Sequence, residues 1–519
     1  MNLGRYISRS ALYYPNNIAL IHGDKRYTYQ EFEHRTNRLA QGVLSLGLKK
    51  GDRIALQSWN RSKIVETEVA CYKTGIVRVP VNARLSLSET IHILNDSEPK
   101  AIVVGPQHMG LLLENEAKLK TLEHFICLEN TPAGKISYDE LLAKGNKESP
   151  QIELKPNEMA VLTYTSGTTG KFKAIMQSFD NRLSMIRKAL MIPDISIGPD
   201  DIFAHAGPVT HASGMLLMPV MFRGGCNLIL DRFDVELLLK TIQNENVTYT
   251  LLVPTMINMI LDYPKVHEYD LSSLRGILYG AAPISKARVK QAIELFGPIL
   301  IQGYGMTETT SFTTVLTAKD HADALQDEDQ IRLASCGRSY FDTEVRVVDE
   351  NGKEVPLKQI GEIIMRGPDL MQGYYKDPVL TSNTIMEDWI YTGDMAKVDN
   401  EGYIYIVDRK LDTIISGGFN VYPSEIEEIL YSHPAVFEAC AVGVPDEKWG
   451  EAVKAVVVLK KGRTCSEQEL IVYCMSSLAS YKKPHSIDFV QDLPKNPNGK
   501  ILRRVIREKY WHHKDRRVN

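Results

Sequence analysis

Strand-like and helix-like segments alternate along residues 26–300, and this alternation constrains the fold more than any other feature of the chain. Arg26–Thr28 reads as a strand that runs into a helix, with Thr28 as the N-cap and Phe32 and Leu39 on the apolar face. Further strands are expected at 52–57, 77–81 and 101–105, helices at 64–74 and 86–94, and the pattern returns at 246–300. Alternation at this spacing predicts an α/β fold with parallel, doubly wound sheets.

The pattern changes after about residue 335. Residues 344–349 and 361–366 read as strands, and the Asn351–Gly352 pair between them is typical of a hairpin turn. Beyond Arg409, residues 424–433 and 467–478 read as helices, whereas 436–444 and 453–459 read as strands. We therefore expect a distorted β-barrel-like part and then a small α+β domain. The predicted boundary makes residues 1–409 the N-terminal domain and residues 410–519 the C-terminal domain.

Composition excludes several other classes of protein. The chain carries 61 Lys and Arg against 64 Asp and Glu, a formal net charge of −3, so no global basic field favours nucleic acid. The seven cysteines form no C-x-x-C pair, which argues against a zinc site or a disulfide framework and fits a reducing cytoplasm. Residues 202–222 lack charged side chains, but Pro208 and Pro219 interrupt them, so buried protein interior is expected there and no transmembrane segment.

A segment rich in glycine and hydroxyl residues, YTSGTTGKFK, occupies positions 164–173. Such a backbone can present successive N–H groups to an anion, and its two lysines add positive charge, so the segment suits a polyphosphate. A P-loop NTPase is the alternative, but its motif needs four residues between the glycines and Ser or Thr after Gly-Lys. Here only two residues separate Gly167 from Gly170, and Phe172 follows Lys171, which disfavours that alternative.

The segment resembles the phosphate loop of the adenylate-forming superfamily, which includes acyl-CoA synthetases, nonribosomal adenylation domains and luciferases. Five further segments resemble motifs of that superfamily in the same order: GAAP at 280–283, QGYGMTE at 302–308, YTGD at 391–394, DRKLDTIISGGFNVYP at 408–423 and NPNGKILR at 496–503. The resemblance runs from about residue 8 to residue 507. Its pattern is nearest to the fatty or aryl acyl-CoA ligases.

The resemblance implies a site for ATP and AMP built from the phosphate loop, two segments beside adenine and an acidic residue at the ribose. The implied nucleotide-binding residues are Thr165, Ser166, Gly167, Thr168, Thr169, Gly170, Lys171, Lys173, Gly280, Ala281, Ala282, Pro283, Gln302, Gly303, Tyr304, Gly305, Asp394 and Arg409. A carboxylate such as that of Asp394 suits ribose because it can accept hydrogen bonds from two hydroxyl groups.

The resemblance also assigns catalytic roles to Thr307, Glu308, His211 and Lys500. Thr307 is expected at the α-phosphate and Glu308 at Mg²⁺, a hard cation that takes few carboxylates beside phosphate oxygens. Lys500 is expected to neutralise charge where the acyl carboxylate meets the α-phosphate, because two anions must approach one another there. His211 is expected near the acyl carboxylate, and a purely structural hydrogen bond is the alternative that the sequence leaves open.

The same resemblance implies a small mobile domain that rotates between two half-reactions. Leu411 is its expected hinge, and Gly417 and Gly418 are expected to line the tunnel for the pantetheine arm of coenzyme A. Four positions depart from the usual pattern of the superfamily: Phe172, Ala174, Phe179 and Leu411. The last of these bears on domain rotation, because a lysine or aspartate is usual there.

The implied reaction joins a carboxylic acid to ATP, giving acyl-AMP and pyrophosphate, and a thiol then displaces AMP. ATP, Mg²⁺ and coenzyme A are the expected cofactors, and a small carboxylic acid is the expected substrate. Loading of a carrier-protein phosphopantetheine is one alternative. A non-catalytic nucleotide-binding protein is another, against which the presence of Lys500, Glu308 and Asp394 argues. Neither the acid nor the oligomeric state can be read from the sequence.

Overall fold

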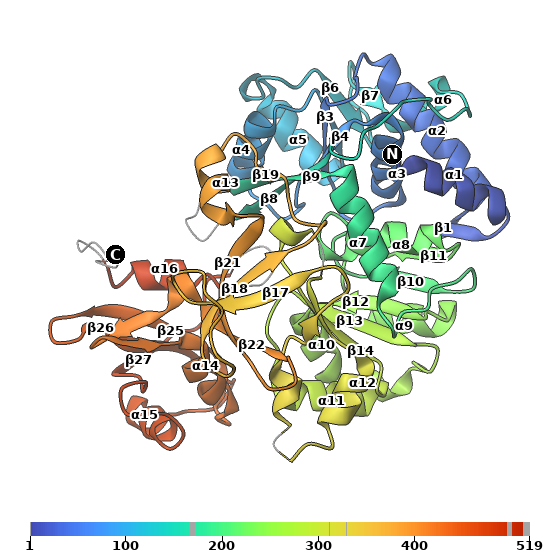
Figure 1. Ribbon diagram of the computed structural model, residues 1–519. Helices are drawn as coiled ribbons and strands as arrows, with labels where there is room; N and C mark the ends of the chain where they lie inside the picture. The colour runs from blue at the N-terminus through green and yellow to red at the C-terminus, as the bar shows by residue number, and fades with distance from the viewer. Residues whose placement is uncertain (1, 167–171, 311, 329, 496–500, 512–519) are drawn as a thin grey trace. The chain divides into compact units, whose positions relative to one another are not determined.

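The computed structural model describes residues 2–166, 172–310, 312–328, 330–495 and 501–511, and the chain forms two compact units (Figure 1). The first unit comprises Met1–Glu344 and Arg366–Ile390, and the second comprises Val345–Met365 and Tyr391–Asn519. Each unit has hydrophobic cores of its own.

The first unit contains an eight-stranded sheet with the order β19-β9-β8-β4-β3-β5-β6-β7. Six neighbouring strands run parallel: β8 (Met159–Ser166), β4 (Val77–Pro80), β3 (Arg53–Gln57), β5 (Ala101–Val104), β6 (His124–Cys127) and β7 (Ile136–Ser137). Strand β9 (Phe172–Ser178) pairs antiparallel with both of its neighbours, β8 and β19 (Gly373–Tyr374). Helices α2 (Tyr29–Ser45), α3 (Ser62–Thr74) and α6 (Tyr138–Lys144) lie on one face, and α4 (Leu87–Ser97) and α5 (Pro106–Glu114) on the other (Figure 1). The sheet is doubly wound, as the strand and helix alternation predicts.

A nine-stranded sheet with the order β16-β15-β14-β13-β12-β10-β11-β1-β2 completes the first unit. Its strands are β1 (Ile18–His22), β2 (Lys25–Thr28), β10 (Ile202–His205), β11 (Cys226–Ile229), β12 (Tyr249–Leu252), β13 (Gly276–Gly280), β14 (Leu300–Tyr304), β15 (Thr314–Leu316) and β16 (Arg338–Ser339). Helices α9 (Val235–Glu245), α10 (Pro254–Leu261) and α11 (Lys286–Phe296) share one core with it, and α7 (Phe179–Met191) and α8 (Leu217–Phe222) contribute to the core on its other face. The short helices α12 (Ala318–Ala324) and α13 (Pro378–Thr384) also belong to this unit.

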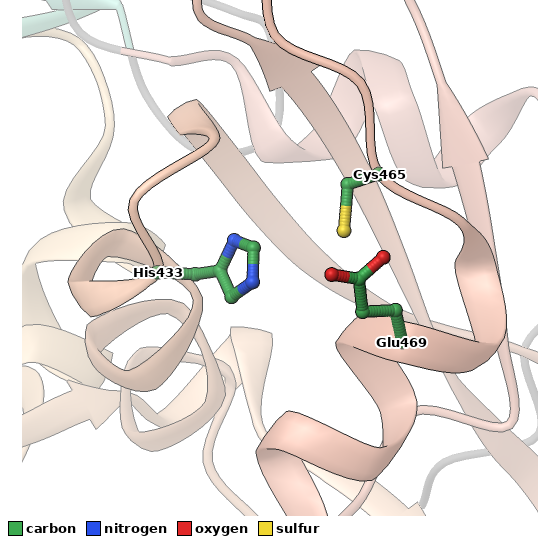
Figure 2. Close-up of side chains that lie close together, drawn as sticks. All are labelled: His433, Cys465 and Glu469. Atoms are coloured by element: carbon green, nitrogen blue, oxygen red, sulfur yellow. The ribbon is translucent and has the colours of Figure 1, made fainter.

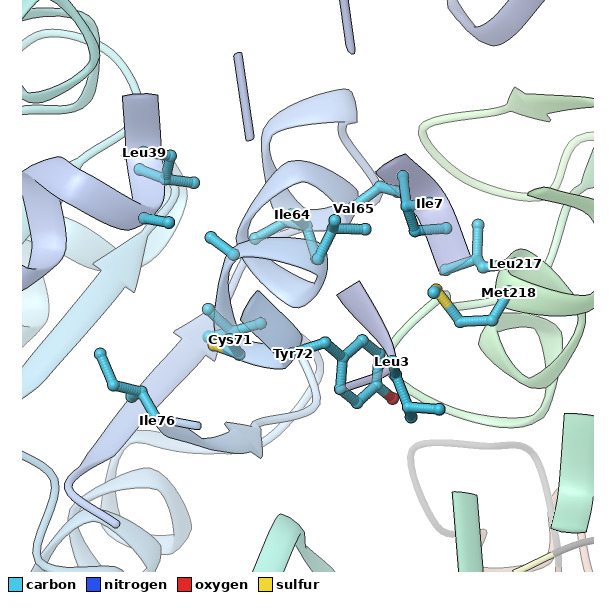
Figure 3. Close-up of a cluster of buried hydrophobic side chains, with 14 of the residues drawn as sticks. Leu3, Ile7, Leu39, Ile64, Val65, Cys71, Tyr72, Ile76, Leu217 and Met218 are labelled. Carbon is cyan, nitrogen blue, oxygen red and sulfur yellow. The ribbon is translucent and has the colours of Figure 1, made fainter. Parts of the chain in front are cut away.

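The cores of the first unit follow from the period-2 alternation of strand side chains. In β3, Ile54 and Leu56 enter one core, whereas Ala55 between them enters the core on the opposite face. Helix α1 (Gly4–Tyr13), α3 and α8 meet in the first of these cores, where Ile7, Tyr72 and their neighbours are fully enclosed (Figure 3). Burial of each such side chain stabilises the fold by about 1.5–3 kcal/mol.

Local signals in the sequence also hold in the structure. Thr28 caps α2 in a reciprocal capping box with Glu31, which fixes the start of that helix. The uncharged run 202–222 folds into β10, a 3₁₀ turn η2 (Ala212–Leu216) and α8, all largely buried. Within the described residues, no helix is long and apolar enough to cross a membrane.

The second unit holds most of a curled five-stranded sheet made of β17 (Glu344–Val348), β18 (Gly361–Arg366), β20 (Ile385–Met386), β21 (Trp389–Val398) and β22 (Ile404–Arg409). The predicted Asn351–Gly352 turn is present, since Gly352 has φ +76° and Val348 pairs with Glu354 across it. This sheet corresponds to the predicted barrel-like part.

A second five-stranded sheet forms the α+β part of this unit, with the order β24-β23-β26-β25 and β27 paired to β26. Its elements are β23 (Ile414–Ser416), β24 (Phe419–Val421), β25 (Val436–Asp446), β26 (Gly450–Leu459), β27 (Ser486–Phe489), α14 (Pro423–Ser432), α15 (Glu467–Met475) and α16 (Arg503–Glu508). Ala439 and Ala441 of β25 enter the core with α14 and α15, whereas Cys440 and Val442 pack with Ile506 of α16. The predicted fold class is confirmed.

Candidate functional site

The phosphate-loop segment is carried by the β8–β9 hairpin. Thr165 pairs with Lys173, and Ser166 pairs with Phe172, in antiparallel register. The predicted residues Gly167, Thr168, Thr169, Gly170 and Lys171 lie outside the described residues. Tyr164 in β8 donates its hydroxyl hydrogen to Asp96 Oδ2 at 2.6 Å, and burial and this carboxylate raise the pKa of Tyr164. Strand β8 is thus anchored by a partly buried, charge-assisted hydrogen bond.

Three residues in or just after this segment depart from the usual pattern of the superfamily, and all three make apolar contacts. Phe172 packs against the core between the sheet and α4, with its ring centroid 5.9 Å from that of His92. Ala174 is buried in β9 opposite Tyr164, and Phe179 is buried at the start of α7 with its ring edge toward Tyr72. These three residues stabilise the hairpin and the helix after it.

The two segments expected beside adenine lie next to each other. β13 and β14 are parallel and pair Gly280 with Gly303, so GAAP and QGYGMTE leave the sheet at the same edge. A Cβ atom on Gly280 would lie 2.2 Å from the carbonyl oxygen of Gly303, so only glycine permits this pairing. Ala281 takes φ +68°, a left-handed conformation that is rare for alanine, and Ala281, Ala282 and Pro283 are exposed.

The second of these segments is held by the strand that follows it. The carbonyl oxygen of Tyr304 accepts hydrogen bonds from the Thr313 N–H at 2.8 Å and from its hydroxyl at 3.0 Å. The Gln302 side chain accepts a hydrogen bond from Tyr279 at 3.3 Å. Backbone hydrogen bonding of this kind holds the segment 302–305 at the end of the sheet.

Glu308 lies in the 3₁₀ turn η4 (Thr307–Thr309), with only 7% of its surface exposed. Its Oε1 accepts a hydrogen bond from the Tyr374 hydroxyl at 2.9 Å, and burial and the Glu308 carboxylate raise the pKa of Tyr374. The Glu308 carbonyl oxygen accepts from Met371 N–H at 2.8 Å, and that of Thr307 from Gln177 Nε2 at 3.1 Å. The turn is therefore held from two other segments of the first unit.

Tyr374 and Gln177 lie outside the six motif segments, so the sequence did not indicate them. Tyr374 also faces the phosphate-loop hairpin, because Lys173 Nζ lies 5.4 Å from its ring centroid. One tyrosine thus contacts both Lys173 and Glu308, which lie far apart in the sequence. A single buried carboxylate with one oxygen engaged fits a cation that keeps water and phosphate oxygens as its other ligands.

His211 lies at the start of η2, with Nε2 at 3.4 Å from Asn82 Nδ2 and Nδ1 at 3.0 Å from Thr210 Oγ1. Burial, together with the positive charges of Arg78 and Arg84, lowers its pKa to about 4, so the imidazole is neutral at physiological pH. Asn82 is a partner that the sequence did not indicate.

His205 has a different setting from His211. Its Nδ1 lies 3.0 Å from both the carbonyl oxygen and the hydroxyl of Ser213, and its Nε2 lies 2.8 Å from Asn227 Oδ1. It is fully buried. These contacts give His205 a structural role between β10, β11 and η2.

In the second unit, Asp394 and Arg409 face each other across β21 and β22. Arg409 Nε lies 2.9 Å from Asp394 Oδ1, and Asp394 is buried. Gly393 takes φ +71°, and its N–H donates to Glu362 Oε1 at 3.0 Å. Glu362 also accepts from Lys410 Nζ at 2.7 Å, and no sequence motif pointed to it.

The predicted hinge residue, Leu411, lies in the 3₁₀ turn η6 (Lys410–Asp412), with 59% of its surface exposed. Its carbonyl oxygen accepts from Arg507 Nη1 at 3.2 Å. Arg503 binds Asp412 at 3.0 Å and Glu427 at 2.7 Å. Arg507 therefore holds the backbone of Leu411, and Arg503 holds the side chain of the next residue, while the Leu411 side chain stays exposed.

Gly417 and Gly418 form the two-residue turn of the β23–β24 hairpin. Their φ values of +58° and +82° match the turn that such hairpins favour, which glycine adopts without strain. A Cβ atom on Gly417 would lie 2.7 Å from the Trp449 ring, whereas one on Gly418 would meet no atom within 4 Å. The hairpin thus gives a structural reason for both glycines.

The predicted catalytic Lys500 lies outside the described residues. The residues on either side of its loop are held together, since Lys495 pairs with Ile501 and Leu502 N–H donates to Pro494 O at 2.8 Å.

The chain matches two family models: that of the AMP-binding enzymes over residues 7–375, and that of the AMP-binding enzyme C-terminal domain over residues 425–500. A feruloyl-CoA synthase of Amycolatopsis is 36% identical over 511 residues, 98% of this chain and 99% of that protein. A medium/long-chain fatty-acid–CoA ligase of Mycobacterium tuberculosis is 34% identical over 96% of this chain and 88% of its own length. The crystal structure of ATP-bound MatB from Rhodopseudomonas palustris superposes with a TM-score of 0.87 at 30% identity, covering 98% of this chain and 99% of that one.

Proposed function

Because this chain belongs to the family of AMP-binding enzymes, we propose that it activates a carboxylic acid with ATP and transfers the acyl group to coenzyme A, releasing pyrophosphate and AMP. The observation that carries the proposal is the meeting of separate motif segments in the first unit. Gly280 pairs with Gly303, and Tyr374 contacts both Lys173 and Glu308. The full-length similarity to CoA ligases supports the acid–thiol ligase reaction.

In the first half-reaction, an oxygen of the acyl carboxylate attacks the α-phosphorus and pyrophosphate leaves. Thr307 and the β8–β9 hairpin bind the phosphates, and Lys500 neutralises charge where the two anions meet. Tyr304 packs on adenine, and Asp394 with Arg409 binds the ribose. His211 remains neutral at physiological pH and orients the acyl carboxylate as a hydrogen-bond partner.

Glu308 is the residue that we propose for Mg²⁺. Its burial and its hydrogen bond from Tyr374 fix one carboxylate oxygen in place. When bound, the ion would offset the charge that develops on the phosphates. The burial of the Glu308 carboxylate supports this proposal, because a buried glutamate needs a compensating positive charge or hydrogen bonds.

The C-terminal domain, residues 410–519, is proposed to rotate about Leu411 between the half-reactions. It presents Lys500 for adenylation and the turn at Gly417 and Gly418 for attack by the thiol of coenzyme A. Support comes from the exposure of Leu411, because an exposed side chain does not oppose rotation by losing buried contacts.

An apolar or aryl acid is the substrate class that we propose. Apolar residues flank His211 in the sequence. Val209 and Leu216 are buried, and Ala212 and Met215 are partly buried against hydrophobic cores of the first unit. The relatives named for feruloyl and medium/long-chain fatty acyl groups accord with this class. All seven cysteines lie in the described residues and none forms a disulfide, which agrees with a reducing cytoplasm as the place of the reaction.

The test measures the two half-reactions separately over a panel of aryl, medium-chain, long-chain and dicarboxylic acids. ATP–pyrophosphate exchange reports adenylation, and AMP release that depends on coenzyme A reports thioester formation. Exchange with an aryl or apolar acid, followed by CoA-dependent AMP release, is the expected result. Exchange without any response to coenzyme A, but with loading of a holo-carrier protein, would replace the proposed acceptor. Inertness toward the whole panel would contradict the proposal of catalysis by an acid–thiol ligase.

A further inference from the structure

A histidine, a cysteine and a glutamate lie together in the second unit, outside all six motif segments. One ligand atom each of His433, Cys465 and Glu469 lies within 4.8 Å of the others. His433 directly follows α14, Cys465 precedes α15, and Glu469 is in the first turn of α15. Figure 2 shows the three side chains pointing into the same space.

Two of these side chains are held by neighbouring groups. Glu469 forms a capping box with Ser466, whose N–H donates to its Oε2 and whose hydroxyl accepts the Glu469 N–H at 3.2 Å. The His433 ring packs edge-on against Tyr473, with centroids 4.8 Å apart and planes at 82°. The Tyr473 hydroxyl lies 3.1 Å from Ser432 Oγ, which links α15 back to the end of α14. The capping box therefore positions Glu469, and the contact with Tyr473 positions His433, without any bound ion.

We propose that His433, Cys465 and Glu469 bind one Zn²⁺ ion, with water as its fourth ligand. Thiolate, imidazole and carboxylate are ligands that zinc accepts in tetrahedral sites, whereas Mg²⁺ and Ca²⁺ prefer oxygen donors alone. Ligand atoms bonded at about 2.0–2.3 Å to one tetrahedral zinc ion lie roughly 3.3–3.8 Å apart. The three ligand atoms lie within 4.8 Å of one another, so their side chains would rotate closer together to hold the ion. Before an ion binds, burial and the neighbouring Glu469 carboxylate raise the pKa of the Cys465 thiol to about 11, so the ion must displace the thiol proton.

Coordination involves two proton changes. The Cys465 thiol gives up its proton to solvent when its sulfur binds the ion. His433 Nδ1 accepts from the Ala435 N–H at 3.3 Å, so coordination through Nε2 would place the ring proton on Nδ1 and end that long hydrogen bond. The bound ion would then tie the end of α14 to the start of α15. The cluster contains one cysteine only, and its histidine lies more than 30 positions away in the sequence. A search for C-x-x-C pairs therefore did not indicate a zinc site.

The test uses tag-free, full-length protein stripped with a chelator that is then removed. His512 and His513 in the C-terminal tail are both changed to Gln, so that they cannot contribute ligands. Co²⁺ serves as the spectroscopic probe, and Zn²⁺ is used to displace it. Of the seven cysteines, Cys465 alone is not fully buried, so a thiolate-to-cobalt absorption band reports on it. One Co²⁺ per chain and a band abolished by Cys465→Ser are the expected results.

Two further variants make the test specific. Glu469→Gln should weaken Zn²⁺ binding by about tenfold or more, since even loss of an outer-shell partner costs about 10–100-fold. Glu428→Gln removes a different exposed carboxylate of the same unit and should leave the affinity unchanged. Mass spectrometry after alkylation supplies an independent readout, because bound Zn²⁺ should protect Cys465. Absence of the band, its persistence in Cys465→Ser, or equal affinities in the two glutamate variants would overturn the proposal.

Discussion

The surroundings of Glu308 in the first unit and of Leu411 in the second differ in how firmly the side chain is held. Glu308 is 7% exposed and accepts a hydrogen bond from Tyr374, and the backbone of its turn is bound by Met371 and Gln177. Leu411 is 59% exposed, although Arg507 holds its backbone carbonyl. Ion binding requires fixed ligand positions, whereas a hinge must change dihedral angles at small cost.

The difference predicts distinct consequences for mutations in the two regions. Changes near Glu308 should alter the chemistry of adenylation or its magnesium requirement. Replacing the Leu411 side chain should alter the balance between half-reactions while each remains possible, whereas restricting the backbone there should suppress one of them. The following predictions test this contrast, from the largest expected effect to the smallest.

Acid should destabilise the first unit strongly. Burial lowers the pKa of His205, His211 and His321 to about 4, below the usual value of 6.5, and all three lie in this unit. Between pH 6.5 and 4 the unfolded chain binds more protons than the folded chain, so stability falls as the pH falls. Each of these histidines should lower the free energy of unfolding at pH 4 by about 3 kcal/mol relative to neutral pH.

Urea unfolding at pH 7 and pH 4, with hydrogen exchange resolved by peptide, measures this effect. Protection in the first unit should drop with acid. His211→Gln should remove about one third of the acid sensitivity, because one of three equivalent histidines no longer titrates. Equal stability of this unit at the two pH values would contradict the burial argument.

Lys500→Ala should lower the rate of adenylation by about 10²–10³-fold or more, because it removes the cation that we propose stabilises the transition state. Conversion of supplied acyl-AMP to thioester should persist. The two half-reactions are assayed separately, and Lys495→Ala serves as control, since Lys495 on the same loop pairs with Glu438 at 2.8 Å. Loss of both half-reactions in Lys500→Ala would contradict the proposal that Lys500 acts in adenylation alone.

The sequence was sufficient to predict the fold class because strand and helix periods are local properties. The resemblance to adenylate-forming enzymes also predicted Gly280 and Gly303 in one site, and the structure pairs the two residues on adjacent strands. The partners of the site were harder to predict. Tyr374 reaches Glu308 from a two-residue strand 66 positions away, and nothing local marks that contact. Long-range partners depend on packing, which a single sequence does not display.

Local patterns were ambiguous at the glycine pair as well. Gly417 and Gly418 were predicted to line a tunnel, and the structure shows that a tight hairpin turn needs them in any case. Both explanations require a residue without a side chain, so the residue type cannot separate them. The same holds for Leu411, where exposure is compatible with a hinge and with an ordinary surface turn.

Leu411→Pro should block thioester formation and spare adenylation. Proline fixes φ and removes the N–H, at a cost of about 3 kcal/mol where the backbone cannot adapt. If one of the two domain orientations carries that cost, the corresponding half-reaction should fall by about 10²-fold. Leu411→Ala keeps the N–H and free rotation, and is the matched control. A proline variant that forms thioester at the wild-type rate would exclude residue 411 as the hinge.

Tyr374→Phe should raise the magnesium requirement of adenylation. It deletes the hydrogen bond to Glu308, and bonds to charged groups contribute about 1.5–3 kcal/mol, so a loss of at least about tenfold is expected at limiting Mg²⁺. Excess Mg²⁺ should restore most of the rate, and Glu308→Gln should show a larger loss with less recovery. Tyr375→Phe removes the adjacent hydroxyl group and serves as control. An unchanged magnesium dependence in both Tyr374→Phe and Glu308→Gln would remove this pair from the metal site.

Leu411→Lys should have the smallest effect. Full burial of a leucine contributes about 1.5–3 kcal/mol, but a side chain that is 59% exposed has less than half of its surface in contact with protein. Replacing it with a charged residue should therefore shift the balance between the two orientations by less than about tenfold. The ratio of pyrophosphate exchange to CoA-dependent AMP release, measured on the same preparation, reports that balance. A shift much larger than tenfold would mean that Leu411 becomes deeply buried in the other orientation, and the contrast with Glu308 would then describe only one state of the enzyme.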